Sequence, residues 1–193
     1  MTLIEMLTVV SILLILLSIV APAVNSARIS ALQKQGSMQF QRFIHALRDY
    51  YSEYQSYPPF MELSEDIGAV FELGSRVNSQ NFIRALSGKE PNGSALTAEH
   101  LRLNPKRIVF LEISPDDLLK TSTGDREEDR IADIFNNEKI FILLENPSDD
   151  DRRIPQILFP EAIKAFVPEA GLLSDIAIWS IHSDPRKNVR SWK

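Results

Sequence analysis

The feature that most constrains this chain is an uncharged, apolar stretch close to its amino terminus. No residue from Met6 to Ser26 carries a formal charge. Inside this stretch, the run from Leu7 to Val24 is interrupted only by Thr8, Ser11, Ser18 and Pro22. A helix needs roughly 20 apolar residues to cross a hydrocarbon layer ~30 Å thick. The sequence therefore predicts a membrane-spanning helix.

A cleaved signal peptide is the alternative explanation of the same stretch. Signal peptides have apolar regions of roughly 7 to 15 residues, preceded by basic residues and followed by a cleavage site of small residues. No Lys or Arg lies between Met1 and Ala27, and the residues from Val24 to Ala27 fit such a cleavage site poorly. These observations favour an anchor that is retained.

The apolar stretch continues directly into an amphipathic pattern. Apolar and small residues recur there every three or four positions, which is the spacing of one helix face. They are Leu32, Gly36, Phe40, Phe43, Leu47, Tyr51 and Tyr54. Pro58 and Pro59 then end the pattern, because proline breaks a helix and restricts the residue before it. We expect one helix from about Leu3 to about Tyr54, on the order of 75 to 80 Å long.

Two residues in the apolar half call for a specific interpretation. Pro22 removes one backbone hydrogen bond, so we expect a kink or a locally melted turn there. Glu5 is the one charged residue among the first 27. It either lies at the lipid headgroups, where it favours the helix amino terminus, or meets a cation inside an assembly of such helices.

Composition excludes several kinds of function. The chain has 21 Lys and Arg against 26 Asp and Glu, so its formal net charge of −5 does not favour nucleic acid as a partner. It has no cysteine for a thiolate nucleophile, a disulfide or a zinc site. His45, His100 and His182 lack metal-ligand spacing, and no glycine-rich phosphate loop or nucleophile elbow occurs. We expect no enzyme, no catalytic residue and no metal centre.

We divide the chain into three parts. Residues 1–25 form the membrane half of the long helix, and residues 26–57 form its amphipathic half. The rest of the chain, residues 58–193, is expected to form a globular α+β domain. β-branched and aromatic residues predict strands at Arg107–Ile113, Lys139–Leu144 and Asp175–Ile181. Shorter helices are expected at Asn78–Ser87 and Pro160–Phe166, and loops at Gly88–Ala95 and Ser114–Arg130. A few antiparallel strands packed on the striped helix half would give an α/β roll.

The amino terminus resembles a known family. The segment from Met1 to Val10 reads MTLIEMLTVV, and with Pro22 it is similar, without gaps, to the processed amino terminus of type IV pilins and type II secretion pseudopilins, which begins Phe-Thr-Leu-Ile-Glu. The resemblance covers about the first 55 residues. It implies that a prepilin peptidase removes a leader, that the amino group of Met1 is methylated, and that Glu5 pairs with the amine of a neighbouring subunit. Such a pair would relieve the desolvation cost of both charges.

Shorter segments are similar to major pseudopilins. They are the helix exit from Tyr50 to Pro58, the segment from Asn104 to Glu112, and the tail from Trp179–Ser180 to Ser191–Trp192. In major pseudopilins a loop near the carboxyl terminus binds calcium, and only Asp184 and Asn188 offer side-chain oxygens in the matching stretch here. Calcium takes 6 to 8 oxygens, so we expect a degraded site and no cofactor. A second acidic cluster, 149–151, is followed by two arginines and is expected to be a charged loop.

The distribution of basic residues around the span bears on which side of the membrane the globular domain lies. The bases Arg28, Lys34, Arg42 and Arg48 follow the span and none precedes it, so the positive-inside rule applied to these residues places the domain in the cytoplasm. A pilin-like protein has its domain in the periplasm. A basic leader ending in glycine, encoded upstream, would resolve the conflict, and we expect one.

Two functions remain open at this stage. The first is a filament subunit of a bacterial type II secretion or type IV pilus-like system, anchored in the inner membrane with a periplasmic domain. Its partners would be the lipid bilayer, further pilin-like subunits, an inner-membrane assembly platform and the prepilin peptidase. The second is a single-pass membrane-anchored binding or enzymatic domain that does not polymerise. It would tolerate replacement of residues 1–25 by an unrelated span, whereas a filament subunit would not.

Overall fold

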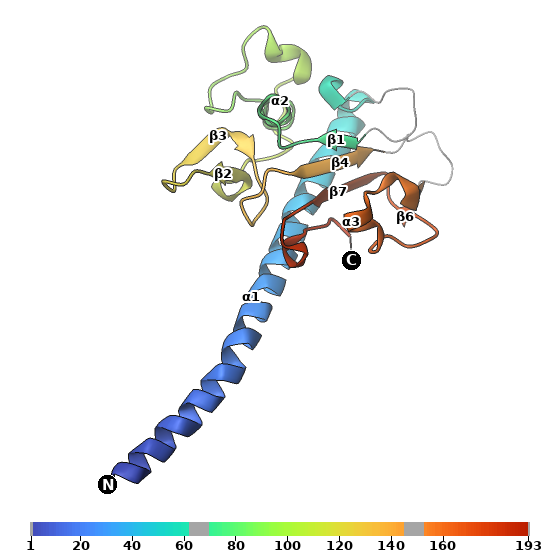
Figure 1. The fold of residues 1–193 in the computed structure, drawn as a ribbon. Helices are drawn as coiled ribbons and strands as arrows, with labels where there is room; N and C mark the ends of the chain where they lie inside the picture. Colours follow the sequence, from blue (N-terminus) through green and yellow to red (C-terminus); the bar gives the residue numbers. More distant parts are fainter. Residues whose placement is uncertain (1, 62–69, 145–152, 193) are drawn as a thin grey trace.

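A computed structural model describes residues 2–61, 70–144 and 153–192. The fold is α+β: a long amino-terminal helix, α1, carries small antiparallel sheets on its carboxyl-terminal half, while its amino-terminal half projects away from the domain (Figure 1). This confirms the predicted fold class.

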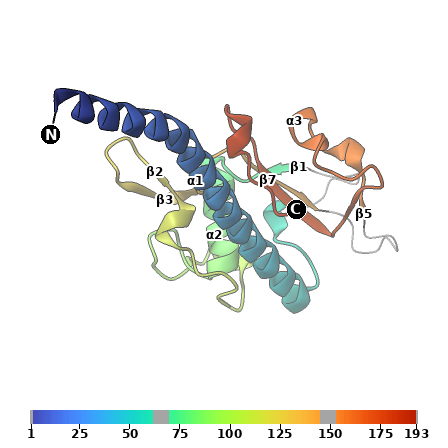
Figure 2. The same ribbon diagram turned by 90° about the horizontal axis from the view of Figure 1, so that it is seen from below.

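Helix α1 spans Leu3–Tyr54, in agreement with the predicted ends. It stops at Gln55, which takes a left-handed conformation (φ 56°) and donates its backbone N–H to the Tyr51 carbonyl at 2.8 Å. Pro22 lies inside the helix, and the helical hydrogen bonding continues on both sides of it. The locally melted turn is therefore absent, because one missing N–H is offset by the intact turns around it. The axis of α1 bends in its apolar half, most clearly in the view from below (Figures 1 and 2).

The central sheet has three antiparallel strands in the order β1–β4–β7. They are Val70–Glu72, Ile140–Leu144 and Ile176–Ser180. The predicted strands at 139–144 and 175–181 are thus confirmed. Side chains alternate across the sheet. Ile142 and Ile178, which are paired in register, belong to the core that includes α1, whereas Leu143 and Trp179 belong to a second core on the opposite face.

Short elements cover that opposite face. They are β5 (Arg153–Ile154), β6 (Leu172–Leu173) and α3 (Glu161–Lys164). The predicted helix at 160–166 is confirmed in its first part, with Pro160 at the N-cap. Seen from below, α3 and β5 lie on one side of α1, and the hairpin of β2 (Leu118–Lys120) and β3 (Arg126–Ile131) lies on the other (Figure 2).

Helix α2 (Arg76–Ser87) packs against the hairpin formed by β2 (Leu118–Lys120) and β3 (Arg126–Ile131). The predicted helix at 78–87 is confirmed, with a start two residues earlier at Arg76, directly after the Ser75 N-cap. The loop predicted at 114–130 is wrong, because Gly124 (φ 87°) closes a hairpin there. The acidic side chains of β3 do not prevent β3 from pairing with β2, because residues of α2 bind them. Arg76 binds Glu127 and Asp129, and Gln80 donates a hydrogen bond to Asp129.

The strand predicted at 107–113 is also wrong. The backbone N–H groups of Phe110 and Leu111 both donate to the Leu86 carbonyl, at 2.8 and 2.9 Å, so the segment caps the end of α2. Arg107 has a positive φ of 53°, which interrupts extended backbone. Apolar side chains of this segment still join the core, which explains its strand-like composition. The loop predicted at 88–95 closes through an isolated bridge between Lys89 and Ala95.

Candidate assembly surface on the amino-terminal helix

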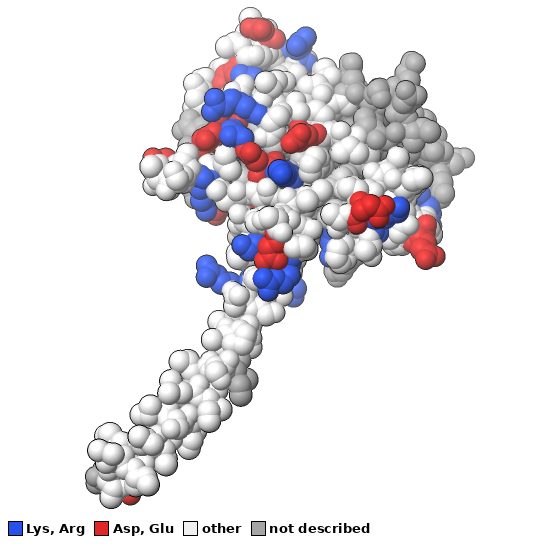
Figure 3. All heavy atoms as spheres, in the orientation of Figure 1, with Lys and Arg blue, Asp and Glu red and all other residues white. Residues whose placement is uncertain are grey.

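The projecting half of α1 is apolar on all sides and exposed on all sides. Leu7, Leu14 and Leu17 are 62 %, 62 % and 64 % exposed. Among the described residues α1 is the one helix long and apolar enough to cross a membrane. At ~1.5 Å per residue, the distance from Leu3 to Val24 matches a hydrocarbon layer of ~30 Å. The space-filling view shows this half as a rod without Lys or Arg, with acidic atoms visible only at its far end (Figure 3).

The packed half of α1 begins at Gly36. A Cβ atom at this position would lie 2.8 Å from Cγ1 of Val189, so the missing side chain permits close approach of the carboxyl-terminal segment. Beyond it, Phe40, Phe43 and Leu47 of the predicted stripe are fully buried. Leu32, Tyr51 and Tyr54 are partly exposed.

Tyr50 is a buried residue that the sequence analysis missed. It is 2 % exposed, and its hydroxyl donates to the Leu103 carbonyl at 2.7 Å. Burial raises the pKa of Tyr50 to about 12. Its position three residues after Leu47 was the signal that could have placed it on the buried face.

Polar contacts hold α1 to the domain in a fixed position. Asp117, 2 % exposed, accepts hydrogen bonds from Gln39 Nε2 at 3.0 Å, from Arg42 Nη2 at 2.6 Å and from the backbone N–H of Ser114 at 2.7 Å. Further along the helix, the Arg48 guanidinium binds the Asp175 carboxylate. These contacts, together with the buried aromatic stripe, fix the packed half of α1 in the domain.

Glu5 lies at the exposed end of the helix and takes part in a capping box. The backbone N–H of Thr2 donates to Glu5 Oε2 at 2.7 Å, and the backbone N–H of Glu5 donates to Thr2 Oγ1 at 3.4 Å. A threonine followed by an acid three positions later is the sequence signal of this motif, and the sequence analysis did not use it. Met1, the other predicted assembly and methylation residue, lies outside the described residues.

The two weak calcium candidates are engaged in other contacts. Asp184 accepts from the backbone N–H and Nε of Arg186 at 3.1 Å each, and from its Nη2 at 3.0 Å, and this partner lowers the pKa of the carboxyl. Asn188 Oδ1 accepts from the backbone N–H of His182 at 2.7 Å. No group of three or more His, Cys, Asp or Glu that could hold a metal ion occurs in the described parts of the chain. The acidic cluster at 149–151 lies outside them.

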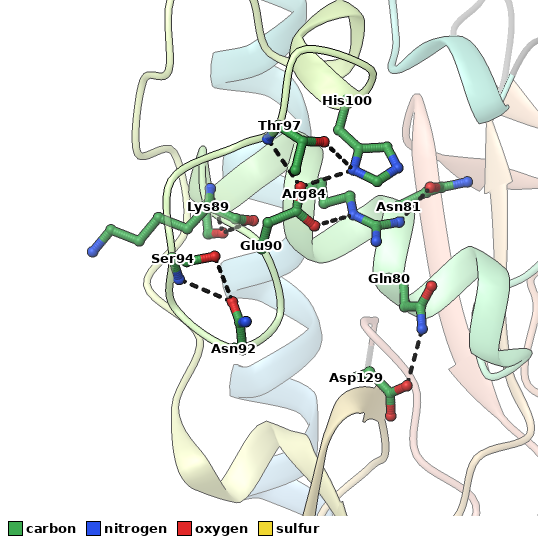
Figure 4. Close-up of polar contacts among 11 residues, drawn as sticks. Gln80, Asn81, Arg84, Lys89, Glu90, Asn92, Ser94, Thr97, His100 and Asp129 are labelled. Atoms are coloured by element: carbon green, nitrogen blue, oxygen red, sulfur yellow. Dashed lines mark hydrogen bonds and ion pairs between the residues drawn. The ribbon is translucent and has the colours of Figure 1, made fainter.

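The histidines do not form a site of metal-ligand type. His45 is exposed on α1, and His182 lies against the Phe135 ring. His100 belongs to a network that the sequence analysis missed (Figure 4). Its Nδ1 lies 2.8 Å from Glu90 Oε1, and Arg84 Nε donates to Glu90 Oε2 at 2.7 Å.

The network determines the charge state of Glu90. Burial by itself raises the pKa of this carboxyl, but hydrogen bonds from Arg84, His100 and the backbone of Thr97 outweigh burial and lower it to about 2. Glu90 therefore stays ionised and ties the loop after α2 to the helix. The arrangement is that of a structural ion-pair network.

Comparison with known proteins gives no relative: no protein-family model, no curated protein and no solved structure matches this chain.

Proposed function

We propose that this chain is a pilin- or pseudopilin-like structural subunit that assembles through its amino-terminal helix into a filament of a type II secretion or type IV pilus-like system. The observation that carries the proposal is the continuity of α1. One unbroken helix joins a half that is apolar on every face to a half that is fixed in a domain. An all-round apolar helix needs lipid or other helices around it.

Assembly would exchange lipid contacts for helix contacts. In the bilayer the exposed half of α1 is surrounded by acyl chains, and in a filament it would be surrounded by copies of itself. The rigid attachment through Gly36, the aromatic stripe and Asp117 supports this role, because the position of the domain then follows the position of the helix. The family resemblance adds an inner-membrane location, a periplasmic domain, leader removal and methylation of Met1.

Glu5 would set the register between subunits. It is the one charge on the apolar half, and an ionised carboxylate moved into an apolar core is costly without a partner. The amino group of a neighbouring chain would supply that partner. The pairing requires Glu5 to exchange its bond to the Thr2 backbone for an intermolecular one.

The capping box is the specific observation that favours a second candidate, a plain single-pass anchor. Glu5 already has a partner within its own chain, and at a helix amino terminus near the headgroups the carboxylate is favourable without any neighbour. In that case the domain would act as a membrane-tethered binding or enzymatic module.

The two functions differ in their response to replacement of the span. A photoreactive amino acid at Leu13, which is 58 % exposed, should cross-link copies of the full chain in its native membranes into a ladder of multiples of the subunit mass. Replacing 1–25 by an unrelated span of similar length, with the probe at the matching depth, should abolish the ladder. A monomer band alone in the natural chain, with normal membrane insertion, would contradict assembly and favour the anchor.

A further inference from the structure

Exposed bases surround the point where α1 leaves the domain. Arg28 and Lys34 lie on the helix between its apolar and packed halves, and both are exposed. Among the described residues neither makes an ion pair. The space-filling view shows Lys and Arg atoms gathered at this neck, with Asp or Glu atoms among them, directly beyond the apolar rod (Figure 3).

A distant segment adds two bases at the same level. The 3-10 turn Pro185–Lys187 packs against α1 at the lower edge of the domain (Figure 1). Its level along the helix is fixed by Gln33 Nε2, which donates to the Asn188 carbonyl at 3.1 Å. Arg186 is exposed and Lys187 partly so. We call the four residues Arg28, Lys34, Arg186 and Lys187 the basic collar.

An acidic residue, Asp184, lies next to the four bases of the collar. Asp184 is paired with Arg186, so the collar keeps a positive excess, although the whole chain carries a net charge of −5. The acidic remainder of the domain is repelled by an anionic surface, while the collar is attracted to it. This asymmetry would orient the domain with the collar toward such a surface.

The collar lies at the depth of the lipid headgroups when the apolar half spans a bilayer. From Val24, Arg28 is ~6 Å and Gln33 ~14 Å further along the helix. The headgroup layer of one leaflet is ~5 to 8 Å thick. Arg28 therefore falls within it, and the long side chains of the other three bases reach to within about one Debye length, ~8 Å at physiological salt.

We propose that the basic collar binds the phosphate groups of anionic phospholipids in the leaflet at the carboxyl-terminal end of the span and holds the domain against the membrane surface. The inference rests on the part of the proposed function that places α1 in a bilayer, and does not require polymerisation. Juxtamembrane bases gain affinity for anionic lipid additively, base by base. The alternative occupant, an acidic surface of a second copy, is an outcome of the test.

The test measures lipid selectivity around the full chain in reconstituted vesicles. Spin-labelled phosphatidylglycerol and spin-labelled phosphatidylcholine are compared in vesicles of phosphatidylcholine, and flotation confirms insertion. The natural chain should concentrate the anionic lipid several-fold at low salt, and 0.5 M NaCl should reduce the ratio to near one, because salt screens exposed charges. The variant Arg186→Glu/Lys187→Glu should lose most of the selectivity.

A matched control uses two exposed bases elsewhere in the domain. Lys89→Glu/Arg102→Glu makes the same charge change at residues that are exposed and make no ion pair among those described. It should leave the selectivity unchanged, and near-ultraviolet circular dichroism should show both double variants folded. Arg186→Lys should retain the selectivity.

Three results would overturn the inference. They are equal retention of the two lipids by the natural chain, unchanged selectivity in the collar variant, and an equal loss in the control variant. Unchanged selectivity combined with weaker self-association of the collar variant would assign the collar to a second copy. Failure of the natural chain to float with the vesicles would instead contradict the membrane placement of α1, which is part of the proposed function.

Discussion

At the scale of single residues, the polar contacts of this protein are built around buried or half-buried carboxylates. Asp117 joins α1 to the turn before β2, and Glu90 joins α2 to the loop after it. Asp133, 2 % exposed, accepts from Ser180 Oγ and from the backbone N–H groups of Phe135 and Asn137. Burial raises the pKa of Asp133, although these hydrogen bonds oppose the rise. Asp117 and Asp133 connect segments far apart in the sequence, whereas the partners of Glu90 lie within ten residues of it.

Glu90 gives the domain a specific dependence on pH. Its folded-state pKa of about 2 lies below the ordinary value of 4.5, so the unfolded chain binds the proton more readily and stability is lost as pH falls from about 4.5 toward 2. Glu90→Gln should remove roughly 1 to 3 kcal/mol of the free energy of unfolding at pH 7 and flatten this acid limb. Urea unfolding of the full chain in detergent at a series of pH values measures both effects. Glu99→Gln is the matched control and should keep the acid limb, because Glu99 is exposed and its side chain makes no hydrogen bond or ion pair among the described residues. An unchanged acid limb in Glu90→Gln would contradict the role of the network.

At the scale of elements, the sequence predicted what depends on local periodicity and missed what depends on partners. The ends of α1 and the strands β4 and β7 follow from apolar spacing and proline positions. The segment at 107–113 has strand-like composition, but its backbone bonds to the end of α2, a contact that no local pattern contains. The hairpin of β2 and β3 was missed because its charges indicated solvent, whereas α2 supplies their partners. The Thr2–Glu5 cap, by contrast, was available from the sequence.

Gly36 tests how α1 is attached to the carboxyl-terminal segment. Alanine is favoured over glycine inside a helix by up to about 1 kcal/mol, but here its Cβ would lie 2.8 Å from Val189, and overpacking costs about 1 to 3 kcal/mol. Gly36→Ala should therefore lower the free energy of unfolding. The same Cβ would also lie 3.0 Å from Ile134 Cγ2, so the clash is relieved only in an Ile134→Ala/Val189→Ala background, where Gly36→Ala should raise the free energy of unfolding. Chemical unfolding of four proteins, with and without Gly36→Ala in each background, measures how the substitution changes the free energy of unfolding. A change of the same sign in both backgrounds would contradict the proposed close approach.

At the scale of the whole molecule, a domain is attached to a helix whose other half is exposed and packs against none of the described residues. The domain buries its own core on both faces of the central sheet, so the exposed helix half is not needed to complete it. What covers that half decides the function. A bilayer alone is sufficient for an anchor, and a filament requires a second environment in which Glu5 finds a cation. The position of Glu5 thus separates the two candidates more sharply than any residue of the domain.

Glu5→Gln separates the charge of this residue from its capping role. Glutamine can still accept the hydrogen bond from the Thr2 backbone, because capping boxes use either Glu or Gln, so the helix end and membrane insertion should be preserved. If subunits pair through this charge, the cross-linked ladder from the Leu13 probe should fall at least about tenfold, since an unpaired amine in the apolar core costs more than 1.4 kcal/mol. Thr2→Ala is the complementary control: it removes one cap hydrogen bond and keeps the charge, so the ladder should persist. A ladder retained in Glu5→Gln and lost in Thr2→Ala would show that the cap matters and the charge does not, and would contradict the role of Glu5 in setting the register between subunits.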